Sequence, residues 1–312
     1  MPSKLLMELH PFDLQIQTTA SDGKHTPREC VEMAKANGLH TVAITDHDTV
    51  AGVAEGLAAG RAAGIRVIPG IEISALEHRM HILGLGVDAA FGPLLSATAK
   101  FREDRVVRAR QMVEGLQSAG FVVLWEDVLR EAGEATITSP HIVGAIMKRP
   151  ENEQKLRGVT TKHEFYERFL PNSGSSYAPA ASIRAREAID LIHKAGGVAI
   201  WSHPPIPDFM DDCTALEEFL KELISYGLDG VERFGPFLTE ASVICLEELA
   251  GRYRLLITGG SDFHERYDAA GKPWPRSAAT IGEFPTYGRS VDGIVAALDA
   301  AMAKSQSVAK TL

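Results

Sequence analysis

The 312-residue sequence has few cysteines and lacks a long apolar run. Its three cysteines, Cys30, Cys213 and Cys245, lie far apart and form no Cys-x-x-Cys pair. We expect them to be small core residues rather than a disulfide framework or a zinc knot. No apolar stretch approaches the roughly 18 residues that span a bilayer, and residues 1–8 are too short for a signal-peptide core. The sequence therefore predicts a soluble cytoplasmic protein without membrane contacts.

Positive charge is also scarce. The chain has 32 Lys and Arg against 41 Asp and Glu, which gives a formal net charge of −9. A broad nucleic-acid surface needs a basic face to neutralise phosphates, so we expect no extended duplex-binding surface. The charge is compatible with a small phosphorylated substrate or a single-strand end, because bound divalent cations supply positive charge locally.

Short apolar segments alternate with helix-forming segments in both halves of the chain. Thr26-Pro27-Arg28-Glu29, for example, places a capping residue, a first-turn proline and an acid where a helix begins. The expected strands are 13–17, 41–44, 66–73, 80–84, 198–201, 230–234 and 255–258. Continuous apolar strands separated by helices favour a parallel sheet covered by helices. About seven such units predict an α/β barrel.

Residues 91–177 interrupt this alternation. The segment reads as mainly helical, with a long helix over 100–120 and helix starts at Ser139-Pro140 and at Thr161. We interpret it as a helical subdomain inserted into a barrel that is formed by residues 1–90 and 178–312.

Acids and histidines gather where the expected strands end. Carboxyl ends of parallel strands share one face of a barrel, and that face carries the active site. Mixed histidine and carboxylate ligands suit zinc, manganese or iron, and a multi-metal site suits hydrolysis of phosphate esters. The residues concerned are Asp22, Asp46, His47, Asp48, Glu72, His81, His203, Asp262 and His264.

Six short motifs resemble those of one family. They are Thr19-Ala20-Ser21-Asp22-Gly23, Thr45-Asp46-His47-Asp48, Gly70-Ile71-Glu72-Ile73-Ser74, His81-Ile82-Leu83-Gly84, Ser202-His203-Pro204 and Gly260-Ser261-Asp262-Phe263-His264. In this order the sequence resembles the PHP (polymerase and histidinol phosphatase) metallophosphoesterases. It is most similar to the stand-alone bacterial branch, which includes nucleotide phosphatases and 5′→3′ exoribonucleases. The resemblance covers nearly the whole chain and implies a distorted seven-stranded β/α barrel.

The resemblance also implies a trinuclear metal cluster. The implied ligands are Asp22, His47 and His264 for one metal, Glu72, His81 and His141 for a second, and Asp262 with bridging Glu72 for a third, with His203 at the substrate end.

The first strand departs from the family pattern. The family has His-x-His there, whereas this chain has Gln15-Ile16-Gln17. A neutral glutamine carbonyl is a weaker ligand than imidazole for zinc or iron. We therefore expect two well-held divalent ions, of manganese, zinc, iron or magnesium, with the third site missing or weak.

Arginines of the inserted segment are candidate phosphate ligands. Arg102, Arg105 and Arg108 recur every third residue and share roughly one helix face. They suit bidentate contacts to phosphate, although a solvated face paired with neighbouring acids explains the spacing as well. Arg233, at the end of an expected strand, is a second candidate.

The sequence thus predicts a metal-dependent phosphoesterase acting on a nucleotide or an RNA or DNA end through metal-activated water. His203 would orient or protonate the leaving group, with Asp22, Arg102 and Arg105 as further catalytic residues. Two alternatives stay open. One is a non-catalytic metal- or phosphate-binding protein in which Gln15 and Gln17 mark lost activity. The other is a different hydrolysis on the same scaffold, such as that of histidinol phosphate or an amide.

Overall fold

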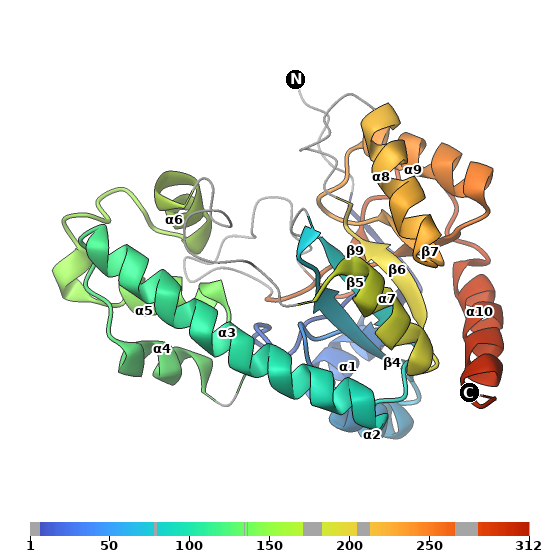
Figure 1. Ribbon diagram of the computed structural model, residues 1–312, viewed down its shortest axis with the longest axis horizontal. Coiled ribbons are helices and arrows are strands. Elements are labelled where there is room, and N and C mark those ends of the chain that lie inside the picture. Colours follow the sequence, from blue (N-terminus) through green and yellow to red (C-terminus); the bar gives the residue numbers. More distant parts are fainter. Residues whose placement is uncertain are drawn as a thin grey trace.

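The computed structural model describes residues 7–77, 80–133, 135, 137–170, 183–204, 213–265 and 280–311. Figure 1 shows a strand-and-helix body from which a helical arm extends to one side. No helix in these ranges is both long and apolar enough to cross a membrane.

The body is built on one seven-stranded sheet. Its strands follow chain order: β2 (Phe12–Asp13), β3 (Thr41–Ile44), β4 (Arg66–Ser74), β5 (His81–Leu85), β6 (Val198–Ser202), β7 (Gly230–Phe234) and β8 (Leu256–Gly259). The segment after β2 also contacts β8, since the Leu14 N–H donates to the Gly259 carbonyl at 3.2 Å and Ile16 bridges Phe263. The sheet therefore nearly closes on itself, and the expected distorted barrel is confirmed.

The expectation of a wholly parallel sheet is wrong for one strand. β5 runs antiparallel to both β4 and β6. Only the short stretch between Ser74 and His81 joins β4 to β5, too short for the crossover that a parallel pair requires. Because β5 is reversed, its first residue, His81, pairs with Ser74 at the end of β4 and with Ser202 at the end of β6. The reversal keeps His81 at the edge where the other strands finish.

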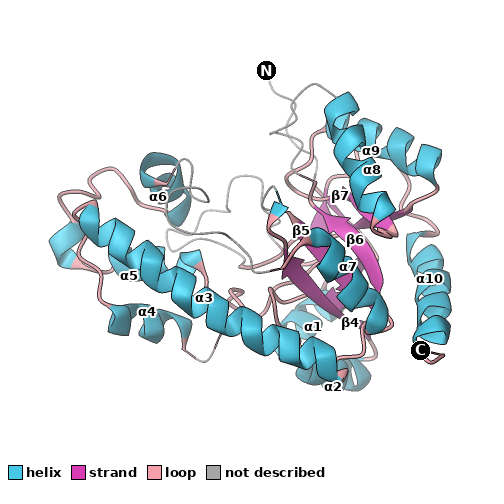
Figure 2. Cartoon of the chain, in the orientation of Figure 1, coloured by secondary structure: helices cyan, strands magenta, loops and turns pink. Residues whose placement is uncertain are grey.

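Helices cover the outside of the barrel (Figure 2). They are α1 (Pro27–Ala36), α2 (Val53–Ala63), α7 (Ala185–Lys194), α8 (Cys213–Ser225), α9 (Glu240–Tyr253) and α10 (Ile294–Ala309). Thr26 caps α1 in the predicted capping box with Glu29. A separate antiparallel pair, β1 (Glu8–Leu9) and β9 (Glu283–Phe284), lies beside the barrel sheet.

The expectation that all three cysteines are plain core residues is also wrong. Cys213 and Cys245 form a disulfide with a Cα–Cα distance of 6.0 Å, which links α8 to α9; Figure 1 draws both helices at the same corner. Their separation of 32 residues gave no hint of pairing, because only the packing of the two helices brings them together. Cys30 is a free, buried thiol, as expected.

The arm contains α3 (Gly92–Ser118), α4 (Trp125–Ala132), α5 (Ser139–Met147), the 3₁₀ turn η2 (Pro150–Asn152) and α6 (Lys162–Phe169). α3 belongs to two cores: Leu94 and Phe101 pack in the barrel core, whereas Met112 and Leu116 pack with the other arm helices. The second core supports the proposed inserted subdomain. Its exact limits stay a prediction, and the end at residue 177 falls outside the described residues.

Candidate metal centre

The fold brings strand-end side chains together at one edge of the barrel. His47 follows β3 and forms an isolated parallel bridge with Glu72 of β4. His81 begins β5 beside the end of β4. Residues of the loops after β2 and β8 meet as well, since the Lys24 N–H donates to the His264 carbonyl at 2.8 Å. Segments from both ends of the chain therefore surround one site.

Two groups of side chains are arranged to hold cations. Asp22, His47 and His264 form one, and His47, Glu72 and His81 form the other; within each group the ligand atoms lie within 4.8 Å of one another. Asp22 Oδ1 and His47 Nδ1 are buried without a hydrogen-bond partner. Buried polar atoms are normally satisfied, so these unpaired atoms, in a nitrogen and carboxylate set that suits zinc, manganese or iron, fit bound metal ions.

Glu72 links the two sides of the site. Its side chain is wholly buried. Oε1 lies 2.7 Å from His81 Nδ1 and 3.1 Å from His203 Nε2, while Oε2 lies 3.6 Å from His47 Nδ1. Burial raises the pKa of Glu72, but the charges of His47 and His81 outweigh it and hold that pKa well below its usual value. A buried carboxylate with histidines near both oxygens is suited to bridging cations.

The two glutamines contact the same carboxylate. Gln15 Nε2 donates to Glu72 Oε2 at 3.2 Å and to Ser202 Oγ at 2.9 Å. Gln17 Nε2 also donates to Glu72 Oε2. An amide nitrogen has no lone pair for a metal, unlike the imidazoles that the family pattern has here. Both amides therefore donate to the same oxygen of Glu72.

Carboxylates at this edge of the barrel raise the pKa of two histidines. Burial lowers the pKa of His264, but the carboxylates of Asp262 and Asp22 outweigh it and raise that pKa to about 9. Burial also lowers the pKa of His203, but the hydrogen bond to Glu72 and the charge of Glu72 outweigh it and raise that pKa to about 10. The excess negative charge that causes both shifts is the field that attracts cations.

Backbone strain is concentrated in these loops. His203 has φ 25°, Asp262 φ 47° and Asp48 φ 54°, in the left-handed region that residues other than glycine rarely adopt. Strain of this kind costs about 1–3 kcal/mol per residue and persists where the surroundings enforce it, often at functional sites.

His141 lies outside both groups of ligand atoms. Its Nδ1 accepts the Thr138 N–H at 3.1 Å as part of the capping box of α5, and burial lowers its pKa to about 4. It interacts electrostatically with Asp22, so the arm does bring it toward the centre. Neither group of ligand atoms includes His141, and its role as a ligand beside Glu72 and His81 stays a prediction.

The arginines separate into different environments. Arg105 is buried; its Nε donates to Asp48 Oδ2 at 2.6 Å and its Nη2 to Ser74 Oγ at 3.0 Å. Arg102 is exposed, and Arg108 is half-buried, with a pKa lowered to about 10 by burial and by Arg105. A three-residue step turns a helix by about 300°, so the side chains drift around it. Arg105, on the arm helix α3, binds Asp48 and Ser74 of the barrel. A phosphate contact by Arg102 stays a prediction.

Arg233 is not placed for phosphate binding. It is buried and forms an ion pair with Glu247 of α9 at 2.7 Å. The register with β8 is irregular between Glu232 and Phe234; Arg233 contacts the covering helix, whereas Glu232 contacts the His203 N–H at the site.

Two positioning carboxyls were not predicted as such. Asp46 accepts hydrogen bonds from the Thr18 N–H at 2.7 Å and the Ser21 hydroxyl at 2.8 Å, and so holds the turn that carries Asp22. Glu232 Oε2 accepts the His203 N–H at 2.8 Å, and burial raises the Glu232 pKa well above its usual value. The one available signal for Glu232 was a carboxylate in the middle of a short strand.

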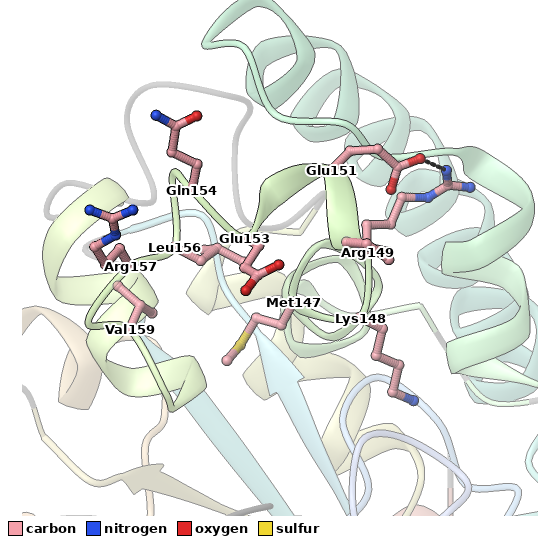
Figure 3. Close-up of a pocket in the computed structure, with 10 residues that line it drawn as sticks. Met147, Lys148, Arg149, Glu151, Glu153, Gln154, Leu156, Arg157 and Val159 are labelled. Carbon is pink, nitrogen blue, oxygen red and sulfur yellow. Dashed lines mark hydrogen bonds and ion pairs between the residues drawn. The ribbon is translucent and has the colours of Figure 1, made fainter.

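A cavity of about 940 Å³ lies in the arm, away from these ligands. Figure 3 shows Lys148, Arg149 and Arg157 around it together with Glu151 and Glu153, and Arg149 pairs with Glu151. Charges of both signs alternate on its wall, and it contains none of the candidate ligands.

The sequence is similar to those of known proteins. The PHP domain family model matches residues 13–156. The chain is 33% identical to the phosphoribosyl 1,2-cyclic phosphate 1,2-diphosphodiesterase of Eggerthella lenta, covering 82% of this chain and 94% of that protein. It is 30% identical to the 5′-3′ exoribonuclease Rnm of Salmonella typhimurium, over 81% and 85% of the two chains. It is also 30% identical to the 3′,5′-nucleoside bisphosphate phosphatase of Chromobacterium violaceum, over 81% and 87%.

A solved structure agrees. A protein from Bifidobacterium adolescentis, described as a metal-dependent phosphoesterase, superposes with a TM-score of 0.75 at 31% identity and covers 94% of this chain and 98% of its own. The match thus extends over barrel and arm together, with identity high enough to indicate common descent. The chain belongs to the PHP family and is a metal-dependent phosphoesterase.

Proposed function

We propose that the chain hydrolyses a phosphate monoester or diester of a nucleotide or of an oligonucleotide end. The observation that supports this most is the pair of candidate ligand groups that share His47, one completed by Asp22 and His264 and the other by Glu72 and His81. Divalent cations held there would stabilise negative charge on phosphate oxygens and lower the pKa of water. Similar proteins act on RNA, a nucleoside bisphosphate or a cyclic phosphate ester.

We propose that the centre holds two cations. Asp22, His47 and His264 would hold one, and Glu72 with His81 the other. The third family position would be replaced by the amides of Gln15 and Gln17, which donate to Glu72. The ligand set combines imidazole with carboxylate and suits zinc, manganese or iron better than magnesium.

The protein side chains have separate roles in this proposal. His203 lies against Glu72 with its ring nitrogen toward the centre, so it would donate a hydrogen bond to phosphate or leaving-group oxygen. Arg102 would contact a substrate phosphate from the arm, and Asp262 would hold His264, whose Nδ1 lies 2.8 Å from the Asp262 carbonyl. The net charge of −9 favours a small substrate or a strand end over a duplex.

The test is a substrate panel. Purified protein loaded with manganese, zinc or iron should release phosphate or a nucleotide from at least one of four substrates: a nucleoside monophosphate, a 3′,5′-bisphosphate, a cyclic phosphodiester or a 5′-phosphorylated RNA oligomer. The substrate with the highest kcat/KM defines the class. Hydrolysis of an amide alone would show that the proposal is wrong.

A non-catalytic role is the competing proposal, and the glutamines favour it. If Gln15 and Gln17 mark lost activity, the metal-loaded protein would bind phosphate without turning over any substrate of the panel. Binding measured by calorimetry beside the activity assay separates these two outcomes.

A further inference from the structure

Three polar side chains with unpaired atoms lie in the barrel near the candidate metal centre. Glu232 of β7 and Thr258 of β8 are register partners, and Gln15 follows β2, which adjoins β8. Glu232 Oε1, Thr258 Oγ1 and Gln15 Oε1 are buried without hydrogen-bond partners. Barrel interiors are usually filled by branched apolar side chains, and unpaired buried polar atoms are costly. The presence of the Glu232 carboxyl in this interior therefore calls for a physical explanation.

Glu232 makes one hydrogen bond that accounts for its position. Its Oε2 accepts the main-chain N–H of His203 at 2.8 Å, although the two residues are 29 apart in sequence. Glu232 is 1% exposed, whereas His203 is half-buried. Without Glu232, the His203 N–H would lose its protein acceptor.

His203 needs such an anchor. Its backbone has φ 25°, a conformation that a residue with a Cβ avoids. Its ring is held at the other end, with Nε2 3.1 Å from Glu72 Oε1 and 3.2 Å from His81 Nδ1. The Glu232 carboxyl therefore contacts the main chain of His203, and the Glu72 carboxyl contacts its ring.

We propose that Glu232 is a positioning residue, which fixes the strained backbone of His203 so that its imidazole faces Glu72 and the substrate. Glu232 would touch neither substrate nor metal ion. The inference rests on the proposed phosphoesterase function for its kinetic readout, but its structural readout is independent of turnover.

The variants separate the acceptor from the rest of the side chain. Glu232→Gln keeps an oxygen that accepts the His203 N–H, whereas Glu232→Met keeps the length and removes the acceptor. Thr258→Val is the matched control, because it changes the neighbouring position in the same layer without a contact to His203. If the Glu232→Met variant fails to fold, Glu232→Asn is used in its place. The asparagine side chain is one methylene shorter than glutamate, so its oxygen would not reach the His203 N–H.

The structural readout is hydrogen exchange at the His203 amide, followed by NMR with the metal-loaded protein. Its protection should fall about tenfold to a hundredfold in Glu232→Met and stay near the wild-type level in Glu232→Gln and Thr258→Val. Unchanged protection in Glu232→Met would overturn the proposal, whether or not the protein shows any activity.

The kinetic readout is the split between kcat and KM. Glu232→Met should lower kcat about tenfold to a hundredfold while KM and bound metal stay within about threefold of wild type. Glu232→Gln should restore kcat to within about threefold. If the Gln variant is as impaired as the Met variant, or if metal is lost in parallel with kcat, Glu232 acts otherwise and the proposal is wrong. A wild-type enzyme inactive on every substrate contradicts the proposed function instead.

Discussion

His47 and Glu72 face each other across a parallel bridge at the ends of β3 and β4, with His47 Nδ1 3.6 Å from Glu72 Oε2. His47 belongs to both groups of ligand atoms, and Glu72 is contacted by histidines through both oxygens. This pair therefore connects the two halves of the centre, and damage to it should affect both.

Replacing His47 by Ala should lower kcat/KM about a hundredfold or more and reduce bound metal, because both groups lose a ligand. Elemental analysis and phosphate release from the best substrate measure the two effects. His40→Ala, an exposed histidine before β3, is the matched control and should change neither. Normal metal content in His47→Ala would contradict the assignment.

Restoring histidine at positions 15 and 17 should recreate the third metal site. Imidazole nitrogens would replace the amide groups that now donate to Glu72. The double variant Gln15→His/Gln17→His should bind about one more metal equivalent than wild type by elemental analysis. An unchanged count would refute the view that these glutamines replace metal ligands.

Arg105 should matter for stability more than for substrate binding. Its ion pair with Asp48 is buried, and removing one partner of such a pair costs about 3–5 kcal/mol. Arg105→Met should lower the free energy of unfolding in urea by about that amount, and adding Asp48→Asn should recover part of it. Arg102→Met, at an exposed position, should stay within about 0.5 kcal/mol and instead raise KM. A reversal of these two patterns would contradict the assignment.

One pH effect lies away from the metal centre. The hydrogen bond to Asp229 at 2.7 Å raises the pKa of His193 above 6.5. A raised histidine pKa means that its stabilisation is fully present below the unfolded value and is lost as the pH rises through the folded value. Both side chains are about one-third exposed, so solvent screening limits the effect to about 1 kcal/mol or less.

The measurement is urea unfolding of metal-free wild type and His193→Gln between about pH 5.5 and 8.5. The advantage of the wild type should be largest at the acidic end and shrink toward the basic end. An advantage that grows with pH would show that Asp229 does not raise the pKa of His193.

The disulfide should contribute to stability. It closes a loop between residues 32 apart, and loops of this size are associated with about 2–4 kcal/mol. A reducing agent should lower the Tm of the wild type but leave that of Cys213→Ser/Cys245→Ser unchanged. If both proteins respond equally, the two cysteines are not bonded in solution.

The sequence predicts the barrel and the edge that bears the site because both follow from local patterns. Apolar strands alternate with capped helices, and acids and histidines follow the strand ends. The antiparallel course of β5 was missed, although the short stretch between Ser74 and His81 already excluded a crossover helix.

The features that could not be predicted from the sequence depend on contacts between residues far apart in the chain. Nothing near Arg105 in sequence indicates Asp48 as its partner, and the disulfide depends on how α8 and α9 pack. Glu232 resembles any polar residue in a strand until the fold brings the His203 N–H to it. These relationships join residues from 29 to 57 positions apart.

The central claim is that two cations, held around His47 and Glu72, are sufficient for phosphate ester hydrolysis. The most direct test is to titrate metal into chelator-treated protein and follow phosphate release. The account predicts that activity appears and saturates at about two equivalents of metal per chain. Saturation at three equivalents, or no release at any metal concentration from any substrate of the panel, would contradict it.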